Sequence, residues 1–162
     1  MINTKGLLQR LLENKIEFVL IGGLAATMYG ASTVTYDVDV CFDFSPENVQ
    51  KLLTALRDIH PRVQAQTQWV ALDELPLEQL VNLKNLYLQT DYGSLDLLGS
   101  LIEVGNYQEV SRHANEISIF AMPCRVLQIE TLLRIKEGMG RPKDRQVALE
   151  LKAILEKEKR IC

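Results

Sequence analysis

The chain has 162 residues, of which 47% are hydrophobic and 24% are charged, and its net charge is −3. This composition is ordinary for a globular protein and is unlike that of a strongly basic nucleic-acid-binding domain. No apolar run approaches the roughly 20 residues that a membrane-spanning helix needs, so we expect no membrane partner. The length predicts a single domain over residues 1–162.

The N-terminal segment and the cysteines indicate the compartment. Charges interrupt the apolar positions before residue 16, which predicts an amphipathic helix and not a signal peptide. The three cysteines, Cys41, Cys124 and Cys162, are odd in number and widely spaced, so they form neither a disulfide framework nor a zinc pattern. Because His60 and His113 are far apart in the sequence, a histidine-based metal site is not expected either. We therefore expect a cytoplasmic protein.

The small net charge hides an asymmetry between the two ends of the chain. Residues 1–124 carry 8 Lys/Arg against 15 Asp/Glu, whereas residues 125–162 carry 10 against 6. One interpretation is that the basic end is a solvated helix face. The other is that it faces an acidic site or a phosphate-rich substrate.

Hydrophobic periodicity and turn residues predict the elements of the first half. Ser45-Pro46-Glu47 is a strong helix start, with a Ser N-cap and a Pro in the first turn. In order, the expected elements are a helix over 4–14, a buried strand over 18–21, a break at Gly22-Gly23, a short helix over 24–29, a loop over 31–36, a strand carrying Asp37-Val38-Asp39, and a helix from Ser45 to about residue 59.

The second half is less regular, and residues 60–85 receive no functional role. A strand is expected over 62–66, and residues 67–83 stay unassigned apart from a short helix beginning at Pro76. The remaining expected elements are strands over 86–89 and 95–98 joined by a turn at Asp91-Tyr92-Gly93, a helix over 106–114, strands over 117–121 and 125–127 separated at Pro123, a helix over 130–137 interrupted at Gly138-Met139-Gly140, and a last helix from Pro142 to about residue 159. This order predicts an α/β fold with a mixed sheet and a helical C-terminal end.

Two aspartates carry the clearest chemical signal. Strand side chains alternate, so Asp37 and Asp39 point to the same face, which Cys41 continues. Two adjacent carboxylates repel unless a cation lies between them, and Mg²⁺ favours one or two carboxylates together with substrate phosphates. The Gly22-Gly23 turn lets backbone come close to a phosphate. The alternative is a solvated strand face with two chance carboxylates.

Two stretches resemble a known family. Gly22-Gly23, then thirteen residues, then Asp37-Val38-Asp39 resembles the signature of the DNA-polymerase-beta-like nucleotidyltransferases, in particular small GG-type members related to AbiEii-type toxin nucleotidyltransferases. The stretch from Gly140 to Asp144 resembles the G-R-x-K-D segment that follows a lysine-bearing helix in these members. The resemblance implies the nucleotidyltransferase αβ core, a mixed sheet flanked by helices.

The resemblance also implies roles for individual residues. Asp37, Asp39 and Asp96 are the expected catalytic carboxylates and hold one or two Mg²⁺ ions, for which Mn²⁺ is a substitute. Asp96, which stands in an otherwise apolar run, has a hydrogen-bonded structural role as its alternative, and Asp91 competes for the third position. The expected nucleotide-binding residues are Gly22, Gly23, Thr33, Thr35, Lys136, Arg141 and Lys143.

Several other residues have plainer interpretations. Asp144 is expected to cap the last helix or to pair with a lysine. Cys41 is expected to be a small buried hydrophobe and not a nucleophile. Trp69 and Tyr92 are candidates to stack on a base, with core packing or chance exposure as the alternative.

These expectations define a Mg²⁺-dependent nucleotidyltransferase that moves a nucleoside monophosphate from an NTP to an acceptor. The acceptor is an RNA such as tRNA, a protein side chain or a small molecule, and a role in a toxin–antitoxin pair with an antitoxin partner is an extension of this hypothesis. The alternative function is a non-catalytic binding module with the same fold. A D-x-D phosphatase fits less well, because the Gly-Gly turn has no role in it.

Overall fold

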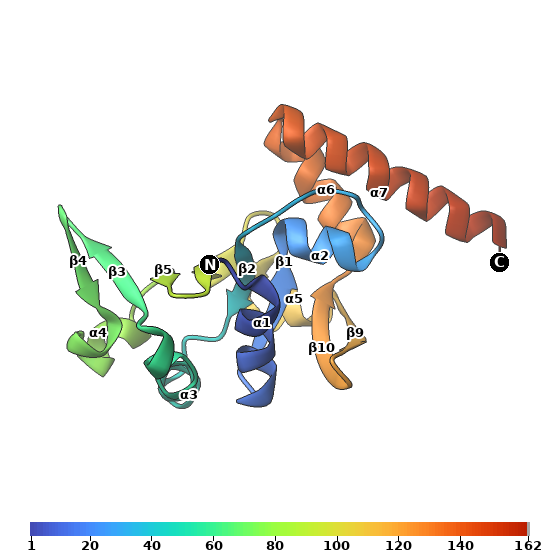
Figure 1. Ribbon diagram of the computed structural model, residues 1–162. Coiled ribbons are helices and arrows are strands. Elements are labelled where there is room, and N and C mark those ends of the chain that lie inside the picture. The colour runs from blue at the N-terminus through green and yellow to red at the C-terminus, as the bar shows by residue number, and fades with distance from the viewer. Residues whose placement is uncertain (162) are drawn as a thin grey trace.

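The computed structural model describes residues 1–161 and shows a mixed sheet with helices on both faces (Figure 1). The helices are α1 (Thr4–Glu13), α2 (Gly22–Met28), α3 (Pro46–Leu56), α4 (Leu77–Val81), α5 (Tyr107–Arg112), α6 (Ile129–Met139) and α7 (Pro142–Ile161), with short 3-10 turns η1 (Arg57–Ile59) and η2 (Leu72–Glu74). The strands are β1 (Phe18–Ile21), β2 (Val38–Phe42), β3 (Arg62–Ala65), β4 (Gln68–Ala71), β5 (Asn85–Thr90), β6 (Gly93–Leu98), β7 (Ser100–Leu101), β8 (Gly105–Asn106), β9 (Ala114–Ile119) and β10 (Met122–Leu127).

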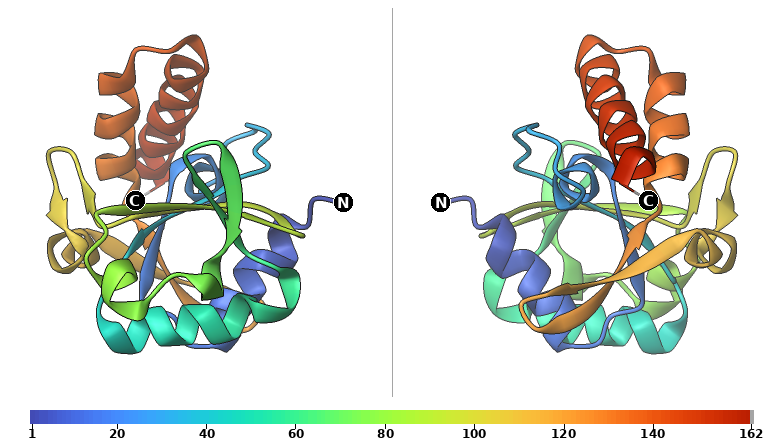
Figure 2. Two further views of the ribbon diagram at one scale, coloured as in Figure 1. Left: turned by 90° about the vertical axis from the view of Figure 1, so that its left-hand side faces the viewer. Right: turned by 90° about the vertical axis from the view of Figure 1, so that its right-hand side faces the viewer.

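Eight strands form one sheet in the order β4-β3-β5-β6-β2-β1-β10-β9. The β2–β6 and β1–β10 pairs are parallel and the other pairs are antiparallel. In the orientation of Figure 2, α1 and α3 lie below the sheet, and α2, α6 and α7 lie above it. The expected α/β fold with a mixed sheet and a helical C-terminal end is thereby confirmed. No helix within residues 1–161 has both the length and the apolar character to span a membrane.

Alternating burial along the central strands separates the core from the site. In β6 the residues Gly93, Leu95 and Leu97 are buried, whereas Ser94, Asp96 and Leu98 are only partly buried. Leu95 and Leu97 lie opposite Val38 and Val40 of β2 and belong to the main apolar cluster. Since strand neighbours point to opposite faces, the same alternation directs Asp39 and Asp96 to the upper face.

Most expected elements are present, and four departures have physical causes. Helix α2 begins at Gly22 and not after Gly23, because Gly22 takes a positive φ of 70° that makes the turn itself. Helix α6 runs through Gly138 to Met139 and ends only at Gly140, which is in the left-handed conformation. The expected break at Pro123 is wrong, because Pro123 lies within β10.

The pairing of β10 explains why Pro123 lies within a strand, and the fourth departure concerns the edge strand β4. Proline is tolerated in β10 because the only recorded β1 partner of this strand is Val126, so the missing N–H of Pro123 interrupts no ladder with β1. The unassigned residues 67–83 contain β4 and the expected short helix after Pro76, which is α4. The hairpin β3–β4 rises on the same side of the sheet as α6 and α7 (Figures 1 and 2).

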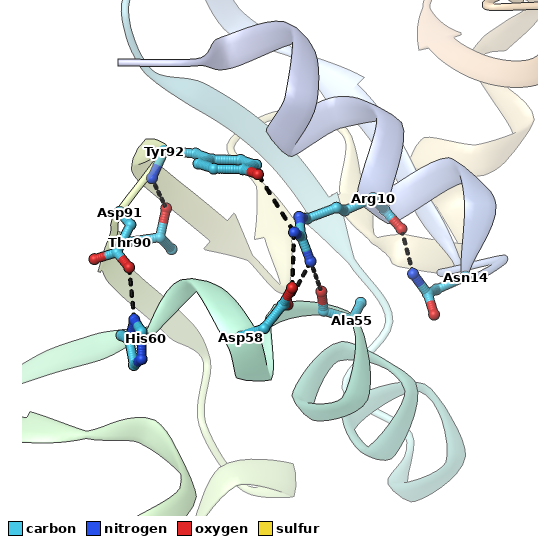
Figure 3. Close-up of polar contacts among 8 residues, drawn as sticks. All are labelled: Arg10, Asn14, Ala55, Asp58, His60, Thr90, Asp91 and Tyr92. Carbon is cyan, nitrogen blue, oxygen red and sulfur yellow. Dashed lines mark hydrogen bonds and ion pairs between the residues drawn. The ribbon is translucent and has the colours of Figure 1, made fainter. Parts of the chain in front are cut away.

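A polar network fixes α1 to the underside of the sheet (Figure 3). The guanidinium of Arg10 donates to both carboxylate oxygens of Asp58, at 2.5 and 3.0 Å, and to the carbonyl of Ala55 at 3.2 Å. It also lies over the ring of Tyr92, 5.0 Å from the ring centroid. Tyr92 therefore has a structural contact and is not free to stack on a base.

Truncation of the core below the carboxylates is expected to be costly. Leu97 is fully buried next to Val40, so Leu97→Ala should lower the free energy of unfolding by about 2–5 kcal/mol. The control is Leu149→Ala, because Leu149 is 65% exposed on α7 and should change stability by less than about 0.5 kcal/mol. Urea unfolding measures both; equal losses in the two variants would contradict the assigned core.

Candidate active site

Two carboxylates meet at the centre of the sheet. Asp39 of β2 and Asp96 of β6 are direct cross-strand partners in a parallel pair. Both are partly buried on the upper face of the sheet. A one-residue shift in either strand would send its carboxylate into the core, so the register is strongly specified.

The pair carries more negative charge than its surroundings neutralise. Burial, followed by the charge and hydrogen bond of Asp96, raises the pKa of Asp39 to about 6. Burial also raises the pKa of Asp96. Asp37 adds to both effects through its negative charge, whereas Lys136 opposes the effect on Asp39. A site of this kind gains stability from a cation or from a shared proton.

Asp37 stands just outside this pair. It is exposed and precedes the first residue of β2, so it influences Asp39 and Asp96 through its charge. Within residues 1–161, no three His, Cys, Asp or Glu side chains are grouped as a metal site. The structure thus brings together two of the three expected carboxylates and places the third beside them.

Gly22 is required by the position of Asp39. A Cβ on Gly22 would lie 2.5 Å from Oδ2 of Asp39, and the φ of 70° also disfavours any other residue. A Cβ on Gly23 would lie 3.3 Å from the Cβ of Thr35, a closeness that places this threonine against the same turn. The Gly-Gly turn therefore lets backbone approach the Asp39 carboxylate closely, whereas the expected approach to a phosphate stays a prediction.

Cationic groups face the carboxylates from the C-terminal helices. Lys136 of α6 is buried, and its Nζ donates to Oδ1 of Asp144 at 3.3 Å. Arg141 donates from Nε to Oδ2 of the same carboxylate at 2.5 Å. Asp144 is 1% exposed, and the bond from Arg141 is the main cause that lowers its pKa. The expected pairing of Asp144 with a lysine is thus observed.

A cavity of about 260 Å³ joins these groups. Its polar wall is made by Asp39, Asp96, Lys136 and Arg141. The apolar wall comes from β6, β7, β10 and α6, and its residues are Leu98, Leu101, Leu127, Leu132, Ile135 and Met139. One partly open cavity thus combines paired carboxylates, two cations and an apolar surface, which suits a ligand with a phosphate and an organic part.

Sequence reasoning missed Tyr87, which also lines the cavity. Tyr87 is 55% exposed and is the β5 partner of Asp96. The signal was present: the two-residue turn Asp91-Tyr92 pairs Thr90 with Gly93, and counting back along both strands brings Tyr87 opposite Asp96.

The other expected binding residues lie around this cavity and not in its lining. Thr33 and Thr35 line a neighbouring cavity between α1, α2 and Phe120. Lys143 is exposed, and its Nζ donates to the carbonyl of Val34 at 3.3 Å. These contacts link the loop before β2 to the start of α7, so Lys143 supports the loop that leads to Asp37.

The thiols take no part in this chemistry. Cys41 is buried, and burial raises its pKa to about 12, which agrees with the expected small hydrophobe. Among the described residues, Cys41 and Cys124 are free. Cys162 lies outside the described residues.

Comparison with known proteins was informative at the level of structure. No protein-family model matches the chain, and no curated protein sequence does. The lincosamide antibiotic adenylyltransferase LnuA, solved with lincomycin bound, aligns over 94% of this chain and 98% of its own with a TM-score of 0.64 and 20% identity. A candidate nucleotidyltransferase from Thermotoga maritima aligns over 97% of this chain and 96% of its own, with a TM-score of 0.55 and 16% identity.

A third similar structure is ANT(2'')-Ia in complex with adenylyl-2''-tobramycin, with 97% and 95% coverage, a TM-score of 0.53 and 14% identity. The chain has the nucleotidyltransferase fold. At these identities the similarity shows the fold alone. The carboxylate pair of this chain is therefore identified from the strand register and burial described above, and not from the similar structures. The relation to AbiEii-type toxins stays a prediction.

The raised pKa of Asp39 predicts a pH-dependent stability. Between about pH 4, the usual value for aspartate, and pH 6, the folded state binds more protons than the unfolded state. The metal-free protein should therefore lose stability as the pH rises through this window. Asp39→Asn should raise the melting temperature at pH 7 in EDTA, and this gain should shrink towards pH 4. If wild type and Asp39→Asn had equal melting temperatures at pH 7 in EDTA, the proposed repulsion between Asp39 and Asp96 would be contradicted.

The buried ion network predicts a second effect. Asp144→Asn leaves Lys136 buried without its counter-charge and should lower the free energy of unfolding by roughly 3 kcal/mol. Asp58→Asn is the comparison variant, because its carboxylate is 69% exposed, although the Arg10 side chain that it pairs with is only 23% exposed. Chemical unfolding of both variants measures the difference. A loss at Asp144 no larger than that at Asp58 would show that the network does not hold α6 and α7 together.

Proposed function

We propose that the protein is a nucleotidyltransferase that uses an NTP donor and a divalent cation. The observation that carries the proposal is the Asp39–Asp96 pair, which the parallel β2–β6 register places side by side under the buried Lys136. The nucleotidyltransferase fold supports the same conclusion. On a fully solvated strand face, the two carboxylates would not be partly buried in one cavity with Lys136.

The donor set fits Mg²⁺, and Mn²⁺ as its substitute. Asp39 and Asp96 offer hard oxygen ligands with uncompensated charge, and Mg²⁺ takes one or two carboxylates together with phosphate oxygens. These two residues would hold the cation, and Asp37 would add charge beside it. When bound, the cation supplies charge neutralisation and orientation for the phosphates. Of Asp96 and Asp91, the two residues that compete in the sequence for the third carboxylate position, Asp96 is the ligand on this proposal.

The triphosphate of the donor is proposed to lie between the Gly-Gly turn and the C-terminal helices. Gly22 lines the cavity next to Asp39, and Lys136 and Arg141 bring positive charge to the same cavity. Because Asp144 holds both cations, their positions are set before the nucleotide binds. Preorganised charge of this kind stabilises the developing charge of the transition state.

The proposed reaction is a displacement at the α-phosphorus. An acceptor hydroxyl oxygen forms a bond to the α-phosphorus, the bond from that phosphorus to the bridging oxygen breaks, and pyrophosphate leaves with the bonding electrons. Asp96 is the proposed acceptor of the hydroxyl proton, since its carboxylate lines the same cavity as Asp39 and Lys136. Lys136 lies in the same cavity to offset the charge of the leaving group.

The acceptor is proposed to be a small molecule. Two similar structures contain antibiotics or their adenylylated product, lincomycin in LnuA and adenylyl-2''-tobramycin in ANT(2'')-Ia. The net charge of −7 over residues 1–124 is unfavourable for an RNA acceptor. An RNA or protein acceptor, an antitoxin partner and a toxin role stay predictions, which the labelling experiment below also addresses.

The test is incubation of the purified protein with Mg²⁺ and each α-labelled NTP, together with a small-molecule extract, total RNA or cell protein. We expect a labelled small-molecule product with one or more NTPs. Asp39→Asn and Asp96→Asn should reduce its formation at least about 100-fold, because each removes a ligand charge needed only for the reaction.

The matched control is Asp91→Asn, the same substitution in the exposed β5–β6 turn, and it should keep wild-type labelling. Labelling that survives in Asp39→Asn would contradict the assigned site. An absence of label on every acceptor, together with no effect of Mg²⁺ and NTP on the melting temperature, would favour the alternative of a non-catalytic binding module.

A further inference from the structure

A single row of side chains crosses five strands and begins at the carboxylate pair. Asp39 pairs with Asp96, and Asp96 pairs with Tyr87. Between β5 and β3 the recorded pairs are Leu88 with Val63 and Gln89 with Arg62, so the next position in this antiparallel register brings Gln64 level with Tyr87. Gln64 in turn pairs with Trp69 of β4.

Cross-strand partners share a face, so the row Asp39, Asp96, Tyr87, Gln64 and Trp69 points to the upper side of the sheet. Neighbouring strands are about 4.8 Å apart, which puts Trp69 roughly 14 Å from Asp96 along the row. No helix covers its outer end: Tyr87 is 55% exposed and Trp69 is 57% exposed. The hairpin that carries Trp69 rises on the same side of the sheet as α6 and α7 (Figures 1 and 2).

The hairpin tip has the chemistry of a surface for hydroxylated rings. Besides Trp69 it presents the exposed, neutral hydrogen-bonding side chains Gln64, Gln66 and Thr67. Trp69 on this hairpin and Tyr87 on β5 are exposed and have no packing role, since the apolar cluster contains neither of them. Amide groups that donate and accept hydrogen bonds beside an aromatic face suit a ring that bears hydroxyl or amino groups.

The charge of this surface excludes a phosphate-rich occupant. Residues 62–71 contain one cation, Arg62, and that guanidinium is already 3.6 Å from the carboxylate of Asp91. A nucleic-acid strand needs several cations along its backbone. A neutral or cationic compound does not, and an amine gains further from the face of a tryptophan.

We propose that Tyr87, Gln64 and Trp69 form the acceptor subsite, and that the acceptor is a hydroxylated compound with at least two rings. Its reacting hydroxyl lies at Asp96, and a second ring about 14 Å away stacks on Trp69. The donor phosphates occupy the other side of Asp39, so donor and acceptor approach the α-phosphorus from opposite sides. This assignment rests on the proposed function, because the row is an acceptor subsite only if the transfer reaction takes place at Asp39 and Asp96.

The chain has one tryptophan, so its fluorescence reports on this subsite alone. The protein without nucleotide is titrated with lincomycin, with tobramycin and with any small-molecule acceptor found by labelling. We expect a saturable change in Trp69 emission with at least one of them. In transfer assays Trp69→Ala should raise the acceptor KM about tenfold and leave kcat and the KM for NTP unchanged, whereas Trp69→Phe should stay near wild type.

The control variant is Phe120→Ala, which removes an exposed aromatic from the β9–β10 turn and should change none of these constants. An acceptor KM unchanged in Trp69→Ala, or label that appears on RNA or protein, would overturn the subsite while leaving the transferase intact. A lack of any transfer would instead overturn the proposed function, and the fluorescence titration would then be the test of the acceptor subsite. If Trp69 emission did not change with any compound, the acceptor subsite would be rejected.

Discussion

The mutual repulsion of two carboxylates governs this structure. The register of β2 and β6 holds Asp39 and Asp96 side by side, and burial raises the pKa of both. An arrangement that costs stability in the absence of a ligand persists only where the surrounding structure enforces it. Here the buried leucines and valines on the other face of the same strands fix the register, so the core itself maintains the strained pair.

The neighbouring features follow from the same constraint. Gly22 is a glycine because any side chain there would collide with the carboxylate of Asp39. Lys136 and Arg141 are held by the buried Asp144, so that their charge faces the pair without neutralising it by direct contact. On our proposals, the cavity with Lys136 and Arg141 takes the donor, and the exposed row from Tyr87 to Trp69 takes the acceptor.

The sequence predicted the strands of the site and the positions of its two carboxylates, but not how the helices and the edge strand contribute to it. Alternation in β2 and β6 and the Gly-Gly turn are local signals, so the strands and the positions of Asp39 and Asp96 were predicted. The burial of Lys136 and its bond to Asp144 depend on how α6 and α7 pack, and periodicity does not record that. Trp69 lay in a stretch without a clear pattern, because β4 is an exposed edge strand of only four residues. Pro123 misled the prediction because strand pairing on only one side tolerates proline.

The central claim is that the Asp39–Asp96 pair is a cation site for a bound nucleotide. Titration calorimetry at pH 6 with Mg²⁺ and an NTP, repeated in two buffers of different ionisation enthalpy, tests it most directly. Since the pKa of Asp39 is raised to about 6, nucleotide binding should require Mg²⁺ and should release protons at this pH, and Asp39→Asn should lose both effects. Nucleotide binding that is independent of Mg²⁺, or that persists unchanged in Asp39→Asn, would contradict the account.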